Sequence, residues 1–97
     1  MAFQYRFKSA FQKTFDELTH SEQTLVVKTL EALQDYHKQS TASYGLRVKK
    51  LHNGKGWNVF EARVNINLRM VWIQTKTEII FSLLGNHDDV RRFLKNL

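Results

Sequence analysis

The chain has 97 residues and no cysteine, which predicts one domain and excludes disulfides, thiolate catalysis and cysteine-based zinc sites. Its 42% hydrophobic and 12% aromatic content is enough for a packed interior, so intrinsic disorder is not expected. The formal net charge of +6 lies in the second half: residues 45–97 carry ten lysines and arginines against four acidic residues, whereas residues 1–44 carry five of each. This uneven charge favours a polyanion or an acidic protein as partner.

The first half of the chain predicts a strand followed by two helices. Apolar and polar residues alternate over residues 3–8, which is typical of a strand with one buried face. Ser9 is the expected cap of a short helix, and Thr19 with Glu22 has the spacing of a capping box that opens a longer one. The longer helix is expected to end within residues 39–45, where polar residues and a glycine interrupt its apolar stripe.

The second half changes to the two-residue period of strands. Asn86 or His87 is expected to cap a short final helix. The order predicts an α+β domain over residues 1–97, with a strand and a helical hairpin followed by a mainly antiparallel meander. We expect the helices to group on one face of that sheet. Four segments are the expected strands: residues 46–51, 57–64, 68–75 and 79–85.

Three charged residues interrupt the apolar pattern of the middle strands. Alternation places Glu61 and Arg63 on one face, and a reversal after residue 64 can bring Arg69 beside them. Two arginines would form a strong anion site, in which Glu61 would fix one guanidinium or accept a proton. The alternative is a surface salt bridge between Glu61 and an arginine, which contributes little to stability. Periodicity alone favours the salt bridge.

His87 lies where the last strand is expected to end and the final helix to begin. Histidine titrates near neutral pH, so it can donate or accept a proton at such a sheet edge. The alternative is that His87 and Asp88 only cap the helix. The four histidines are scattered without a pair at ligand spacing, so neither a metal nor another cofactor is expected.

A basic stretch surrounds the glycine turn at residues 52–56. It can follow a phosphate backbone, although exposed hairpins also carry lysines for solubility. Tyr44 and Trp57 can stack on bases or serve in packing. The chain contains no apolar run long enough to cross a bilayer and no secretory signal, so we expect a soluble cytoplasmic protein without a membrane partner. The basic residues are Arg47, Lys49, Lys50 and Lys55.

The element order resembles the RelE/ParE toxin superfamily of bacterial toxin–antitoxin systems across nearly the whole chain. Two segments carry the resemblance, GLRVKKLHNGKGWNVFEARVNINLRMVW and LLGNHDDVRRFL. Members commonly have an E-x-R-like pattern at the end of one strand, here Glu61 to Arg63, and an arginine among aliphatic residues in the next, here Arg69. A His-Asp-Asp-Val ending, here beginning at His87, recurs in one branch. The resemblance implies a small toxin neutralised by a cognate antitoxin protein.

The RelE-like branch implies an endonuclease that cleaves mRNA on the ribosome without a metal, by attack of the ribose 2′-hydroxyl on the adjacent phosphate. Carried onto this chain, Arg69 stabilises the phosphate, Arg63 is its basic companion, and Glu61 stands where some members have a functional lysine. His87 stands where members place a catalytic arginine or histidine. The resemblance favours this reading over the salt bridge. The alternatives are a ParE-like inhibitor of DNA gyrase, which acts by binding protein, and a non-catalytic relative.

The implied RNA-binding residues extend beyond these four. Many members have a tyrosine near the end of the chain, where this sequence has Arg91. That substitution replaces a stacking ring by a charge suited to phosphate. The residues expected to hold the RNA backbone are Arg47, Lys49, Lys50, Lys55 and Arg91.

Overall fold

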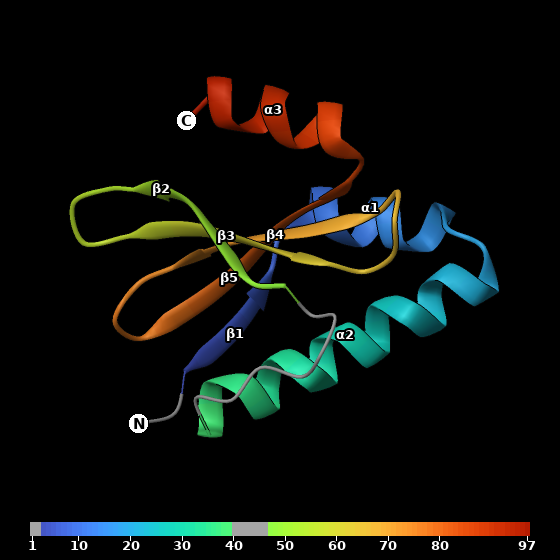
Figure 1. Cartoon of the computed structure of the whole chain (residues 1–97), viewed down its shortest axis with the longest axis horizontal. Helices are drawn as coiled ribbons and strands as arrows, with labels where there is room; N and C mark the ends of the chain where they lie inside the picture. Colours follow the sequence, from blue (N-terminus) through green and yellow to red (C-terminus); the bar gives the residue numbers. More distant parts are fainter. Residues whose placement is uncertain (1–2, 40–46) are drawn as a thin grey trace.

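The computed structural model describes residues 3–39 and 47–97, which form a sheet flanked by helices (Figure 1). Tyr44 and most of the segment expected to end the second helix lie outside the described residues. The elements follow the expected order, and the last strand is followed by a C-terminal helix. They are β1 (Gln4–Phe7), α1 (Ser9–Glu17), α2 (His20–Gln39), β2 (Lys49–Asn53), β3 (Asn58–Arg63), β4 (Arg69–Gln74), β5 (Glu78–Gly85) and α3 (His87–Lys95).

The five strands form one sheet in the order β1-β5-β4-β3-β2. β1 pairs with β5 in parallel, and the other three pairings are antiparallel. This confirms the predicted α+β class and the mainly antiparallel sheet. Because β1 and β2 lie at opposite edges, the α1–α2 hairpin between them carries the chain across the sheet (Figure 1).

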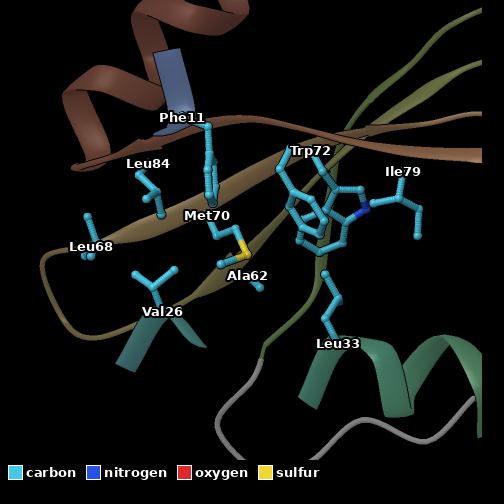
Figure 2. Close-up of a cluster of buried hydrophobic side chains, with 10 residues drawn as sticks. Phe11, Val26, Leu33, Ala62, Leu68, Met70, Trp72, Ile79 and Leu84 are labelled. Carbon is cyan, nitrogen blue, oxygen red and sulfur yellow. The ribbon is translucent and has the colours of Figure 1, made fainter. Parts of the chain in front are cut away.

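The main core lies between one face of the sheet and helices α1 and α2. Trp72 from the central strand is fully buried and packs with Phe81 and Phe60. Phe11 contributes from α1, and α2 contributes the apolar positions that its three- and four-residue spacing predicted. Figure 2 shows these side chains meeting between the sheet and α2: Phe11, Val26, Leu33, Ala62, Leu68, Met70, Trp72, Ile79 and Leu84.

Helix α3 covers the opposite face of the sheet (Figure 1). Its Val90 packs on Val59 and Val71, and all three are buried. The expectation that all helices share one face is therefore wrong. The physical reason is that β3 and β4 carry apolar residues on both faces, so the second face also needs a cover that excludes water.

A bulge in β5 sets where α3 begins. Val71 pairs with Leu83 and Trp72 pairs with Phe81, which leaves Ser82 as the extra residue. The Ser82 hydroxyl donates a hydrogen bond of 3.0 Å to the Ile80 carbonyl. Because the bulge reverses the alternation, the end of β5 leads directly into a helix on the second face.

Side-chain caps define two of the helix starts. Glu22 accepts from the Thr19 backbone N–H at 3.0 Å, and the Thr19 hydroxyl accepts from the Glu22 N–H at 3.2 Å, as the capping box predicted. Asn86 caps α3 and forms a reciprocal pair with Asp89. The predicted cap at Ser9 is wrong: Ser9 is already helical, and the N-cap position is held by Lys8, whose side chain makes no capping bond. No helix in the described ranges is long and apolar enough to cross a membrane.

Candidate active site

Strand register brings the central charged residues together at one end of the sheet. Arg63 at the end of β3 is directly opposite Arg69 at the start of β4, and Arg69 is opposite Gly85 at the end of β5. Glu61 is opposite Val71, which faces α3. Because side chains alternate along a strand, Glu61, Arg63 and Arg69 share the face that α3 partly covers.

A turn stabilised by the Asn65 side chain holds Arg63 and Arg69 directly opposite each other on the two strands. Its side-chain oxygen accepts hydrogen bonds from the backbone N–H groups of Asn67 and Leu68, at 2.8 and 2.9 Å. The Val64 N–H donates to the Leu68 carbonyl at 2.9 Å and closes the reversal. An asparagine side chain that bonds its own backbone two residues on is the characteristic device of such a turn.

His87 reaches the same end of the sheet as the first residue of α3. Two features hold this helix start close to β5. The Asn86–Asp89 box ties down its first turn, with both backbone-to-side-chain bonds at 2.9 Å. Gly85 allows the close approach, because a Cβ at that position would lie 2.6 Å from the Asp89 Cβ.

A cleft of about 350 Å³ joins these residues to the start of β2. It contains all four proposed catalytic residues and two of the proposed RNA-binding residues, so the lining holds four cationic side chains and one carboxylate, besides His87. Arg47 enters the cleft from a backbone with φ of 49°, a left-handed conformation that is uncommon outside glycine. Val48 was missed, because an isolated valine carries no chemical signal in a sequence. The lining residues are Arg47, Val48, Lys49, Glu61, Arg63, Arg69 and His87.

The positive charge of the cleft is not neutralised within the described part of the chain. The described residues form two ion pairs, Arg6 with Glu78 and Arg92 with Asp89, and both pairs lie outside the cleft. The Arg63 Nε is buried and has no hydrogen-bond partner among the described residues. Among the described residues, Glu61 therefore does not form the surface salt bridge that periodicity alone favoured. A buried guanidinium donor without an acceptor is a site that an anion can satisfy.

Three of the predicted RNA-binding residues lie outside the cleft. Lys50 alternates with Lys49 and points to the other face, where its Nζ lies 5.9 Å from the centre of the Phe60 ring. Lys55 lies in the hairpin at the far end of β3. Arg91 lines a separate depression of about 200 Å³ on α3, together with other charged residues of that helix.

Candidate metal ligands are scattered over the described part of the chain. Over residues 3–39 and 47–97, no cluster of three or more histidine, aspartate or glutamate side chains is placed to hold an ion. His87 and Glu61 are the only such residues in the cleft lining, where they lie among cations.

Comparison with known proteins identifies the fold. No family model and no curated protein sequence matches the chain. Its structure is similar to RelE in the RelE–RelB complex of Pyrococcus horikoshii, with 12% identity, a TM-score of 0.70, and coverage of 89% of this chain and 96% of that chain. It is also similar to the YoeB dimer of Staphylococcus aureus, with 17% identity, a TM-score of 0.64, and coverage of 88% and 97%.

A third structure, the DinJ–YafQ complex of Escherichia coli, is 14% identical with a TM-score of 0.62, and the match covers 92% of this chain and 98% of that chain. These matches span about nine-tenths of this chain and nearly the whole of each other chain, so the likeness extends over most of the fold and not one shared motif. The chain therefore has the fold of the RelE-like toxins.

Proposed function

We propose that this protein is the toxin of a type II toxin–antitoxin system and cleaves mRNA as an endoribonuclease. The observation that carries the proposal is the cleft, where Arg63 and Arg69 face each other beside Glu61 and His87 without an ion pair among the described residues. The likeness to RelE, YoeB and YafQ supports the toxin role.

The proposed reaction needs a base, an acid and cations. The RNA 2′-oxygen attacks the adjacent phosphorus as its proton leaves, and the bond from phosphorus to the 5′-oxygen breaks as that oxygen gains a proton. The products are a 2′,3′-cyclic phosphate and a 5′-hydroxyl. Charge accumulates on the non-bridging phosphate oxygens in the transition state, where positioned donors contribute most to the rate.

The residues of the cleft match these needs. Arg63 and Arg69 bind the phosphate oxygens and stabilise the developing charge. Glu61 accepts the 2′-hydroxyl proton, and His87 donates a proton to the 5′-oxygen. Glu61 alone would repel a phosphate, but the four cations of the cleft outweigh its charge.

The basic cleft also indicates how the protein would be neutralised. The neighbouring structures include complexes of RelE with RelB and of YafQ with DinJ. An antitoxin segment carrying carboxylates would pair with Arg63, Arg69 and Lys49 and exclude the RNA phosphate from them. The ribosome would present the mRNA that competes for the same side chains.

Expression in growing cells tests the proposal. Wild-type protein is expected to arrest growth and to introduce new transcript ends, while Arg69→Ala reduces cleavage by about 10²-fold or more because one stabilising donor is lost. Lys28→Ala, an exposed lysine on α2 outside the cleft lining, is the matched control and keeps full activity. Uncut transcripts in wild-type cells would reject the nuclease, and inhibition of gyrase supercoiling by the same protein would then indicate the ParE-like function.

A further inference from the structure

An exposed histidine and a half-buried tryptophan stack on each other beyond the cleft. The rings of His52 and Trp57 lie 5.0 Å apart between centroids and are 25° from parallel. Strand β2 connects the two sites: Lys49 at its start lines the cleft, and Asn53 at its end borders the hairpin. The five residues of β2 span about 13 Å at the usual rise of a strand.

A bulge in β2 aims His52 at the face that carries the cleft. Lys50 pairs with Phe60, but His52 pairs with Val59, so Leu51 is an extra residue in the strand. Without this bulge, His52 would follow Lys50 to the opposite face of the sheet. The bulge instead places His52 on the face of Val59 and Trp57. Bulges often redirect side chains beside functional sites in this way.

The hairpin is shaped to support the tryptophan beneath the histidine. A Cβ at Gly54 would lie 2.5 Å from a ring carbon of Trp57, so only glycine admits the indole at this position. The Gly54 N–H donates to the Trp57 carbonyl at 2.8 Å, and Gly56 has φ of 77°, which glycine adopts readily. Trp57 also packs against the buried cluster of Val59, Val71 and Val90, and this contact holds its ring in place.

We propose that the His52–Trp57 pair is a stacking platform for a base of single-stranded RNA, a few nucleotides from the phosphate in the cleft. This rests on the proposed function, because it assumes that RNA occupies the cleft. A ring that is already immobilised loses little conformational freedom when a base stacks on it. Aromatic side chains in a basic groove are the recurring means of holding unpaired bases. Lys49 at one end of β2 and Lys55 in the hairpin supply cations for the intervening phosphates.

Binding of two RNAs of different length tests the platform. A hexanucleotide with 2′-O-methyl riboses, which cannot attack, reaches from the cleft to the platform, whereas the equivalent dinucleotide fills only the cleft. His52→Ala is expected to weaken hexanucleotide binding about tenfold and to leave dinucleotide binding unchanged. His52→Phe restores the affinity, because it keeps a ring. His20→Ala, another exposed histidine at the start of α2, is the matched control.

Tryptophan fluorescence locates the contact. Trp72 is fully buried, so a change on adding the hexanucleotide reports Trp57. Equal hexanucleotide affinities of the wild type and His52→Ala would overturn the platform, as would failure of His52→Phe to restore binding. If affinity depends on His52 but mRNA stays uncut in cells, the platform stands and the nuclease is wrong. If mRNA is cut but the hexanucleotide affinity does not depend on His52, the nuclease stands and the platform is wrong.

Discussion

Arg63 and Arg69 lie directly opposite each other on β3 and β4, a position where like charges destabilise a sheet. A fold selected for stability alone would place an acid or an apolar residue at one of the two positions. The Asn65 turn nevertheless fixes this register, and Arg63 keeps a buried donor without a partner in the described residues. This arrangement supports the proposal that a bound anion supplies negative charge to the pair.

Substitution of one arginine should therefore separate stability from activity. Arg69→Leu removes the repulsion, so we expect the free energy of unfolding to stay equal or to rise by about 0.2–1 kcal/mol. Cleavage should fall as in Arg69→Ala. Thermal unfolding in phosphate-free buffer measures the first effect. A clear loss of stability would show that Arg69 has a structural partner and would weaken the anion-site interpretation.

His37 is a half-buried histidine that the proposed chemistry does not use. Its ring contacts Phe3, Tyr36 and Trp72, with centroid separations of 5.4, 5.4 and 6.2 Å. Neither ring nitrogen has a hydrogen-bond partner among the described residues. Burial lowers the pKa of His37, and the nearby Gln74 side chain opposes this with a smaller effect.

This lowered pKa predicts acid sensitivity. The unfolded chain binds a proton at His37 more readily than the folded chain does. The contribution of neutral His37 to the free energy of unfolding is therefore present above pH about 6.5 and is lost as the pH falls through the pKa of His37 in the folded protein. His37→Phe keeps the aromatic packing and removes the proton site. We expect the difference in melting temperature between this variant and the wild type to grow as the pH falls from 8 toward 5, in favour of His37→Phe. A constant difference would contradict the prediction.

At the scale of elements, the site depends on how α3 leaves β5. Gly85→Ala places a Cβ 2.6 Å from Asp89, which forces the first turn of α3 and His87 away from the cleft. We expect a loss of about 1–3 kcal/mol in the free energy of unfolding together with a strong loss of cleavage. Urea unfolding and transcript mapping measure the two effects.

Gly56→Ala is the comparison for this element. Its Cβ meets nothing within 4 Å, but the positive φ makes alanine unfavourable by about 1 kcal/mol. The variant should lose stability and keep more cleavage activity than Gly85→Ala, since Gly56 lies outside the cleft lining, in the hairpin that supports Trp57. Equal activity losses in both glycine variants would mean that activity follows overall stability and not the position of α3.

Local patterns predicted most elements and the main grouping of charges. Alternation placed Glu61, Arg63 and Arg69 on one face, and capping-box spacing located the start of α2. What alternation cannot predict is a bulge, because an extra residue reverses the faces without leaving a sequence signal. The face on which His52 lies and the change of face within β5 were missed for this reason.

The placement of α3 was missed for a different reason. Which face a short amphipathic helix covers depends on what the assembled sheet leaves exposed, and Val59 and Val71 come together only after β3 and β4 pair. The catalytic roles also exceed what periodicity supports, since the residues alone favoured a salt bridge. The family resemblance supplied the functional interpretation, and it is supported by the two arginines, which form no ion pair with any described residue.

At the scale of the molecule, the two halves of the chain contribute different parts of the structure. The neutral half supplies β1 and the α1–α2 hairpin that bury the main core, while the basic half supplies the cleft, β2 and α3. Four basic residues of the second half therefore line the cleft, and no lysine or arginine of the described residues is fully buried in the core. Such a cleft should respond to any small anion that fits between the arginines.

Inorganic phosphate should stabilise the folded protein through this cleft. A ligand that binds only the folded state at ten times its Kd adds about 1.4 kcal/mol to the free energy of unfolding. We expect phosphate to raise the melting temperature of the wild type at constant ionic strength and to have no effect on Arg69→Ala. Sulfate, a divalent anion of similar shape, is the control ligand and should act alike. An equal shift in both proteins would place the anion elsewhere.

The chemistry of the cut ends tests the proposed mechanism most directly. Transcripts from translating cells that express the protein are sequenced after treatments that distinguish the possible termini. We predict a 2′,3′-cyclic phosphate on one fragment and a 5′-hydroxyl on the other, with neither in cells that express Arg69→Ala. Fragments with 5′-phosphates, or the same cleavage by Arg69→Ala, would contradict 2′-hydroxyl attack on a phosphate held by these arginines.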